Sequence, residues 1–297
     1  MLMMANIRHP GARQLQAVQV RDGHVAPAAR WAPDEVAVAL VHDAGTTAVM
    51  MATPCDVEDL AVGFSLTEGV IQSTADIARF ELVEAELGLE ARMWLAGSRS
   101  SQLAARRRRI AGPTGCGLCG IDSLREATRA LPPVGRGLRL TADDIQAGLT
   151  GLSHAQALGM ATRAAHAAAW WSPEEGVRLV REDVGRHNAL DKLAGALARA
   201  DVSGSRGPGA VFLTSRVSIE MVQKAVMIGA QAIVAISAPT VLAVQVAEQA
   251  GVTLVGIARD DGFMIFSHAE RLDGMGVATH HPPARDQADA ADATEAQ

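Results

Sequence analysis

The first hundred residues consist mainly of short β-leaning runs in which apolar and polar positions alternate. Five such runs predict strands, the second and third joined by a turn that contains Gly45: residues 15–21, 36–41, 46–52, 80–84 and 92–96. Between them, Asp56 precedes a helical spacing of apolar residues that continues to residue 71. This pattern predicts a small N-terminal α+β domain over residues 15–105, preceded by a loose leader at residues 1–14.

The last third of the chain alternates buried-looking apolar runs with amphipathic segments. The predicted order is strand 210–214, helix 218–229, strand 232–237, helix 240–250 and strand 252–258. Short links between such elements are typical of a parallel sheet covered by helices. Residues 263–267 predict one more strand at the edge of that sheet.

The stretch that leads into this sheet mixes helical and extended patterns. Thr141 and Asp144 have the spacing of a capping box and predict a short helix. Residues 155–169 are rich in alanine, include His166, and predict a second helix. A strand at 176–181 and a helix at 184–200 follow. With the sheet, these elements predict an α/β domain over residues 138–280, so that the chain is α/β (α+β overall).

Residues 106–137 separate the two predicted domains and are rich in glycine and proline, with a short helix predicted at 121–131. The polar end of the chain, residues 281–297, has the composition of a disordered tail.

Composition and charge exclude several classes of protein. The chain has 297 residues and a net charge of −6, which argues against a nonspecific nucleic-acid binder. No apolar run approaches the roughly 20 residues of a membrane span, and the start lacks the apolar core of a signal peptide. Three cysteines do not make a disulfide framework. We therefore expect a cytoplasmic protein without a membrane or nucleic-acid partner.

Two of the three cysteines stand in the glycine-framed sequence Gly115-Cys116-Gly117-Leu118-Cys119-Gly120, just after four consecutive arginines. Four interpretations are open. A closed zinc site needs four ligands, and the chain offers no second cysteine pair, only Cys55 and histidines. A thioredoxin-like disulfide normally follows a strand, and none is predicted here. The others are a loop with incidental cysteines and a reactive thiolate, whose pKa neighbouring arginines and a helix N-terminus would lower.

Small and polar residues follow the predicted parallel strands, where ligands of such sheets bind. They are Thr214, Ser215 and Arg216 after the first strand, Ser237 to Thr240 after the second, and Arg259, Asp260, Asp261 and Gly262 after the third. Hydroxyl groups, a guanidinium and helix N-termini suit a phosphorylated ligand. Ordinary helix caps and loop charges are the competing interpretation.

A dense polar cluster, residues 181–192, joins a predicted strand to a predicted helix and carries seven ionisable side chains, six of them charged and the seventh His187. Arg186, His187 and Asn188 lie near the start of that helix, where anions are favoured. We select His187 as the candidate ligand-binding histidine, whereas His154 and His166 are expected to be structural. A solvated helix start with local ion pairs is the alternative.

These motifs, in this order, resemble the FdhD family, the formate dehydrogenase accessory sulfurtransferases. The resemblance rests on residues 115–120, 181–192, 214–216 and 238–240, with support from residues 54–69 and 254–259, and covers roughly residues 15–275. Several motifs in register make it far more specific than a lone Cys-x-x-Cys.

The resemblance implies an enzyme, a sulfurtransferase that takes persulfide sulfur from a cysteine desulfurase. It would pass this sulfur to the Mo-bis(molybdopterin guanine dinucleotide) cofactor before the cofactor enters formate dehydrogenase. By position, Cys116 would carry the persulfide and Cys119 would be its partner. The implied cofactor-binding segment is Ile257, Ala258, Arg259, Asp260, Asp261 and Gly262. The resemblance further implies a three-layer domain like that of cytidine deaminases, and a homodimer.

A zinc deaminase requires His-x-Glu and Pro-Cys-x-x-Cys motifs, and this sequence lacks both, so we expect no metal site. Two rival functions remain: a non-catalytic chaperone that only binds and delivers the cofactor, and a redox or zinc-dependent enzyme with a deaminase-like fold.

Overall fold

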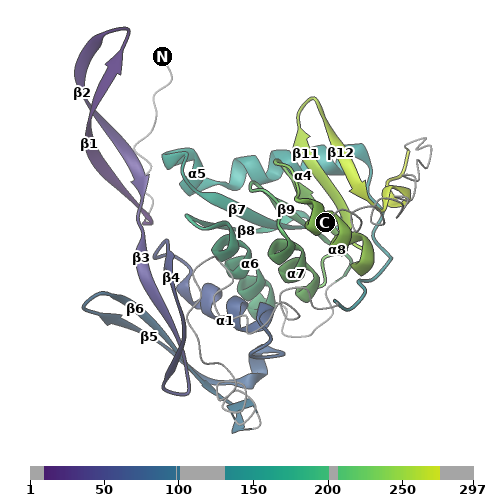
Figure 1. Ribbon diagram of the computed structural model, residues 1–297, viewed down its shortest axis with the longest axis horizontal. Coiled ribbons are helices and arrows are strands. Elements are labelled where there is room, and N and C mark those ends of the chain that lie inside the picture. The colour runs from purple at the N-terminus through teal and green to yellow at the C-terminus, as the bar shows by residue number, and fades with distance from the viewer. Residues whose placement is uncertain (1–9, 98, 101–130, 201–206, 275–297) are drawn as a thin grey trace, which may run out of the picture.

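The computed structural model describes residues 10–97, 99–100, 131–200 and 207–274 (Figure 1). Its largest sheet has six strands in the order β12-β11-β10-β9-β7-β8. Their bounds are β7 His166–Ser172, β8 Gly176–Asp183, β9 Ala210–Leu213, β10 Ala232–Ala235, β11 Thr253–Arg259 and β12 Gly262–Ser267. Strands β9, β10 and β11 pair in parallel, as the sequence predicts, and β12 lies antiparallel at the edge.

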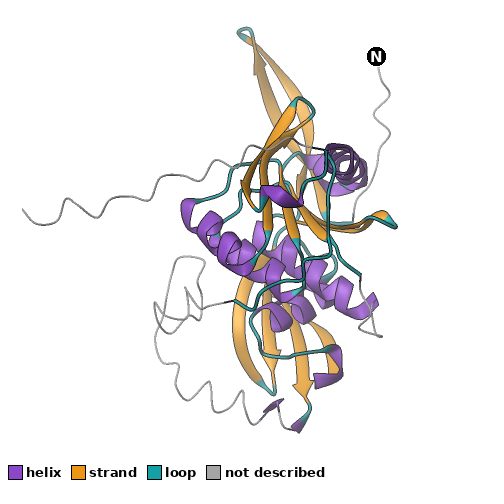
Figure 2. Ribbon diagram, turned by 90° about the vertical axis from the view of Figure 1, so that its right-hand side faces the viewer, coloured by secondary structure: helices purple, strands orange, loops and turns teal. Residues whose placement is uncertain are grey.

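Helices cover both faces of this sheet, so the region has three layers (Figures 1 and 2). Their bounds are α4 Ala142–Ala155, α5 Ala157–Thr162, α6 Arg186–Ala200, α7 Ile219–Met227 and α8 Val241–Ala250. Apolar residues of α6, α7 and α8 share one core with the sheet, and those of α4 share a second core on its other face. The α/β fold class is thereby confirmed.

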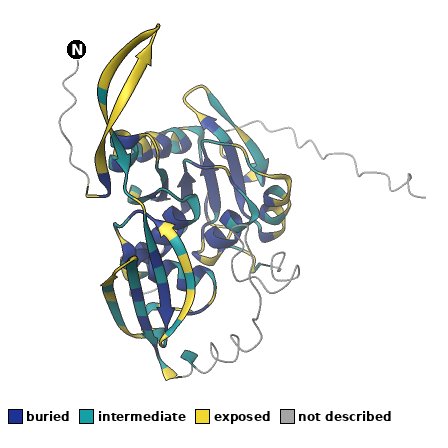
Figure 3. Cartoon of the chain, turned by 60° about the vertical axis from the view of Figure 1, so that its left-hand side comes forward, coloured by how far each residue is buried: buried dark blue, intermediate teal, exposed yellow. Residues whose placement is uncertain are grey.

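A smaller sheet with the order β4-β3-β6-β5 packs one face on helix α1 (Figure 3). The bounds are β3 Val36–His42, β4 Gly45–Ala52, α1 Val57–Thr67, β5 Ile77–Ala85 and β6 Gly88–Leu95. A short 3-10 helix, η1, spans Thr74–Asp76. Each of these strands and the helix appear where the sequence predicts them, although the helix ends four residues earlier than expected.

A two-stranded hairpin, β1 Ala12–Arg21 and β2 His24–Pro33, projects from the body (Figures 1 and 3). Its apolar side chains remain outside the core: Val18 and Val20 are each 68% exposed. The sequence predicts β1 but not β2, whose alanines and prolines lack a strand-like alternation.

The helix predicted over residues 155–169 is wrong in its second half. Helix α5 ends at Thr162, and strand β7 begins at His166. Ala167, Ala168 and Ala169 are completely buried in the interior of the sheet between β8 and β9. Alanine has the highest intrinsic preference for helices. Here, burial of the strand on both faces of the sheet overrides that preference.

Helices α1 and α6 cross at two glycines. A Cβ atom on Gly63 would lie within 2 Å of the backbone oxygen of Asp191, and one on Gly195 would meet the backbone of Asp59. Only glycine permits this approach, which joins the small sheet with α1 to the larger α/β region.

Some predictions lie outside the described residues: the leader up to residue 9, the thiol segment and helix within residues 101–130, and the tail.

Candidate functional site

Three helices begin at one edge of the six-stranded sheet. Strand β8 has the same direction as β9, β10 and β11, because it and β9 both pair antiparallel with β7. Helix α6 follows β8, α7 follows β9 and α8 follows β10, so their N-termini lie at the carboxyl ends of these strands. Free backbone N–H groups and helix dipoles make such an edge favourable for anions.

The loops that follow β9, β10 and β11 are bonded to one another at this edge. The N–H of Val217 donates to the oxygen of Ala238 at 3.3 Å, and the N–H of Thr240 donates to that of Val217 at 2.9 Å. The N–H of Ile257 donates to the oxygen of Ser237 at 3.2 Å. The structure thus brings the three predicted ligand-binding loops together.

Ile257 has a left-handed backbone, with φ of 53°, which a β-branched residue rarely adopts. It lies in a bulge, because the pairing of β11 with β12 is interrupted between Gly256 and Arg259. Gly256 leaves no room for a side chain, since a Cβ atom would lie 3.0 Å from Pro239. Strained residues concentrate at ligand-binding sites, so Ile257 is independent support for this segment.

Three buried polar atoms at the starts of α6 and α7 have no hydrogen-bond partner: Arg186 Nε, His187 Nε2 and Ser218 Oγ. They are half of the six such atoms found among the described residues. Buried polar groups are normally paired, so unpaired ones at a helix N-terminus point to a ligand. Two of them are donors, as an anionic group requires.

The imidazole of His187 is held neutral. Burial, followed by the positive charges of Arg186 and Lys224, lowers its pKa to about 4, against the opposing effect of Glu220 and Glu68. A neutral ring can donate or accept one hydrogen bond at Nε2, depending on its tautomer.

Other polar residues of the 181–192 cluster form hydrogen bonds and ion pairs that link this segment to a distant part of the chain. The carboxylate of Asp183 accepts from the N–H of Thr53 and from Asn188, and pairs with Lys192 at 2.6 Å. The Asp183 and Lys192 side chains are wholly buried. The Nζ of Lys192 also donates to the oxygen of Thr53. A solvated helix start is therefore wrong as an account of these residues.

A second buried group joins α1 to α6 and α7. Lys224 pairs with Asp191 at 2.9 Å and with Glu68 at 2.9 Å, and Thr67 donates to Asp191 at 2.7 Å. Burial raises the pKa of Asp191, and Lys224 opposes that shift. His187 lies one helical turn before Asp191, and the charges of Lys224 and Glu68 are near enough to affect its pKa.

A third group of charged side chains links α1 to α6 and to strand β8. Asp59 accepts from Arg181 at 2.8 Å and from Arg199 at 2.6 Å. Of the cluster's residues, Arg186 and His187 are thus left for a ligand.

The three predicted residues after β9 differ in their availability. The hydroxyl of Thr214 accepts from the N–H of Ala167 at 2.9 Å, which commits it to the sheet. Ser215 is buried and donates to the oxygen of Arg216. Arg216 is exposed and forms no ion pair with a described residue, so it is the one able to reach a ligand.

The predicted segment after β11 also has a part held within the fold and a part that is exposed. Ile257 and the buried Ala258 lie in the bulge at the edge, and the oxygen of Arg259 accepts from Gln146 at 2.9 Å. Asp260 and Asp261 form the exposed turn between β11 and β12, closed by the pairing of Arg259 with Gly262.

Cys116 and Cys119 lie outside the described residues. Cys55 is half-buried at the start of α1, and burial raises the pKa of its thiol. That environment suits a packing residue and disfavours a thiolate. Within the described ranges, no group of three or more His, Cys, Asp or Glu side chains could hold a metal ion.

Sequence reasoning missed Ser218 as a site residue, although it placed the start of α7 there. Its hydroxyl makes no capping bond, unlike that of Thr240, which accepts from the N–H of Ala243. Only the structure distinguishes an occupied cap from an open one.

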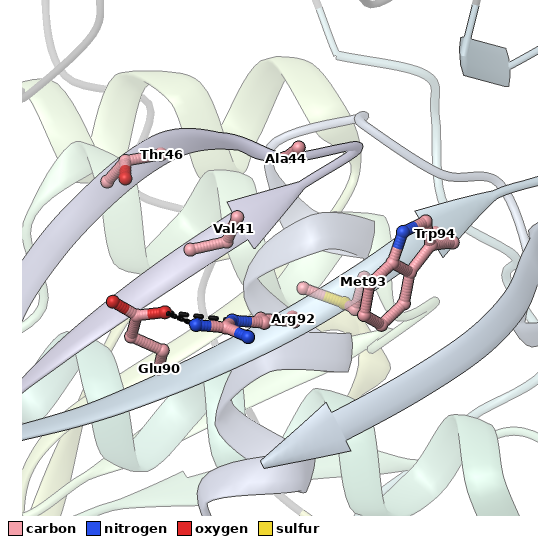
Figure 4. Close-up of a pocket in the computed structure, with 7 residues that line it drawn as sticks. All are labelled: Val41, Ala44, Thr46, Glu90, Arg92, Met93 and Trp94. Atoms are coloured by element: carbon pink, nitrogen blue, oxygen red, sulfur yellow. Dashed lines mark hydrogen bonds and ion pairs between the residues drawn. The ribbon is translucent and has the colours of Figure 1, made fainter. Parts of the chain in front are cut away.

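A cavity of about 320 Å³ lies on the small sheet, away from this edge (Figure 4). Its lining consists of Val41, Ala44, Thr46, Glu90, Arg92, Met93 and Trp94. The two charged residues pair with each other at 2.6 Å, so they offer little to a ligand.

Comparison with known proteins adds four findings. Residues 33–273 match the FdhD/NarQ family. The chain is 47% identical over 261 residues to a sulfur carrier protein FdhD of Agrobacterium fabrum, covering 88% of this chain and 96% of that protein. It is 46% identical to the same-named protein of Variovorax paradoxus, covering 89% and 92%.

A crystal structure of a chain described as a formate dehydrogenase accessory protein, from Desulfotalea psychrophila, has the same fold. It superposes with a TM-score of 0.70 at 23% identity, covering 89% of this chain and all of that one.

Proposed function

This chain belongs to the FdhD/NarQ family, and we propose from that premise that it is a sulfur carrier in the maturation of formate dehydrogenase. Its relatives that carry this name align with nearly their whole length. The finer proposal is a sulfurtransferase that accepts persulfide sulfur from a cysteine desulfurase and delivers it to the Mo-bis(molybdopterin guanine dinucleotide) cofactor.

The observation that carries the acceptor half of this proposal is the edge where α6, α7 and α8 begin. Unpaired donors at Arg186 and Ser218, beside the exposed Arg216, fit the phosphates of a guanine dinucleotide. Ile257, whose backbone is strained, lies at the same edge of the sheet. The neutral ring of His187 suits a hydrogen bond to a phosphate or a base better than a full charge pair. The hydroxyls of Thr214 and Ser215 are bonded within the protein, which supports a role for them in positioning this loop.

The thiol chemistry is assigned to Cys116 and Cys119. The thiolate of Cys116 attacks the terminal sulfur of the donor's persulfide, takes that sulfur, and releases the donor's own thiolate. On delivery, the terminal sulfur leaves Cys116 as sulfide for the metal and so gains two electrons. Those electrons come from the sulfurs of Cys116 and Cys119, which end as a disulfide. A cellular dithiol reductant then restores the pair.

The test is mass spectrometry after incubation with a cysteine desulfurase and cysteine. We expect wild type and Cys119→Ala to gain one sulfur atom, and Cys116→Ala to gain none. An equal gain in Cys116→Ala would overturn the assignment.

A non-catalytic chaperone is the second candidate, since the phosphate-binding edge alone would serve it. The Cys116→Ala/Cys119→Ala double variant separates the two. Full formate dehydrogenase activity in cells that carry this variant would establish the chaperone. A redox or zinc-dependent enzyme is the third candidate, and stoichiometric zinc in the purified protein would support it.

Cytoplasmic location and a homodimer complete the proposal. Within the part of the chain that the structure describes, no helix is both long and apolar enough to cross a membrane. Sedimentation analysis would establish the oligomeric state.

A further inference from the structure

Arg271 is a buried arginine that forms no ion pair with a described residue. It ends the short 3-10 helix η2, Ala269–Arg271, and is only 8% exposed. Its Nη1 is one of the buried atoms that lack a partner, and its side chain forms no hydrogen bond or ion pair with any described residue. An unpaired buried charge is among the costliest features of a folded protein.

The position of Arg271 is opposite to the edge described above. Its Nη2 lies 3.5 Å from where a side chain on Gly251 would begin, just before β11. Thr253, the first residue of β11, is also buried, and its Oγ1 also lacks a partner. Burial lowers the pKa of Arg271, the charge of Glu270 opposes that shift, and the charge of Arg136 adds to it, so both side chains lie near the guanidinium.

Glu270 acts on Arg271 only through its charge, and the two side chains form no ion pair. The carboxylate of Glu270 is exposed and accepts from His268 at 3.0 Å. The terminal carbonyls of α8 are also occupied: the oxygen of Ala250 accepts from Val134, and that of Glu248 from Gly251 and His268. Nη1 of the guanidinium is therefore left without an acceptor among the described residues.

We propose that Arg271, with Arg136 and the hydroxyl of Thr253, forms a second anion site, which takes a phosphate-type oxyanion at the amino edge of the sheet. A guanidinium binds such an anion through two parallel hydrogen bonds. Two arginines with a hydroxyl match a dianion better than a monovalent carboxylate. This site is independent of the proposed cofactor edge, because none of its residues lies there.

The first measurement is thermal unfolding with inorganic phosphate as the probe. Acetate is the comparison ligand, because it tests whether the site prefers a carboxylate. Phosphate stabilises many proteins by exclusion from their surfaces, so the informative quantity is the difference between wild type and Arg271→Met. We expect phosphate to raise the Tm of wild type more than that of Arg271→Met. The Arg79→Ala variant, altered at an exposed arginine of the small sheet, should retain the full shift.

Without added anions, Arg271→Met should be at least as stable as wild type, because it removes a buried charge that has no ion pair and keeps an apolar stem. In saturating phosphate the order should reverse, because bound ligand stabilises only wild type. Titration calorimetry on Arg136→Ala, an exposed position, is the second measurement. We expect binding about tenfold weaker there.

Three results would overturn the proposal. They are an identical phosphate shift in wild type and Arg271→Met, unchanged phosphate affinity in Arg136→Ala, and acetate binding as tight as phosphate binding.

Discussion

The Nζ atom of Lys224 lies 2.9 Å from Oδ1 of Asp191, and each side chain is more than nine-tenths buried. The pair joins α7 to α6, and Glu68 at the end of α1 shares the same lysine. One cation therefore holds three helices that come from distant parts of the chain.

Replacing Lys224 with methionine should lower the free energy of unfolding by about 3–5 kcal/mol, because Asp191 is left buried and unpaired. Chemical denaturation measures this loss. The double variant Asp191→Leu/Lys224→Met should recover much of it. The exposed pair of Arg79 and Glu81 is the control, where Arg79→Ala should cost less than about 1 kcal/mol. Equal losses at the two pairs would contradict this account.

Gly63→Ala should destabilise the chain by more than about 2 kcal/mol, since the new methyl group meets the backbone of α6, which cannot yield locally. Gly137→Ala is the matched control, because open space surrounds that position. The comparison uses denaturation midpoints. A loss at Gly63 no greater than that at Gly137 would show that the two helices can separate without cost.

Stability should fall as the pH drops from about 6.5 to 4. The pKa of His187 is lowered to about 4 in the folded chain, so the unfolded chain binds a proton in this window that the folded chain does not. The contribution is at most roughly 3 kcal/mol and is complete below pH 4. His187→Gln should flatten the profile there.

His166, whose pKa burial also lowers, adds to the same slope, and His166→Gln measures its share. If His187→Gln left the slope intact while His166→Gln removed it, the assignment to His187 would be wrong.

Ser218→Ala and Thr240→Ala should have opposite effects. The Ser218 hydroxyl makes no capping bond, so its loss should change stability by less than about 0.5 kcal/mol yet weaken binding of guanosine diphosphate. Thr240 caps α8, so its loss should cost about 1 kcal/mol with little effect on binding. Calorimetric titration and thermal unfolding on both variants test the pair. If only Thr240→Ala bound guanosine diphosphate more weakly, the proposed position of the phosphate site would be wrong.

The parallel part of the fold could be predicted because each of its strands is a short apolar run and each link is short. The alanines at 167–169 could not be assigned, because a strand buried on both faces shows no alternation. Thr214, Ile257 and their neighbours could be placed at one edge by the rule for parallel strands. Which of them remain free for a ligand depended on contacts that no spacing reveals.

The same limit applies to the 181–192 cluster. Its charge density indicated a special role, but the partners of Asp183 and Asp191 include Thr53 and Thr67, more than 120 positions earlier. Local pattern does not contain such distant pairings.

The crossing of α1 with α6 also determines when α1 can complete its packing during synthesis. Helix α1 leaves the ribosome with Gly63 and Asp59 turned toward a partner that has not yet been made. About 130 further residues must be translated before α6 is complete, which takes roughly ten seconds at bacterial rates. Throughout that interval the surface of α1 that packs on α6 has no partner, so the nascent chain exposes a helix surface that the finished protein buries.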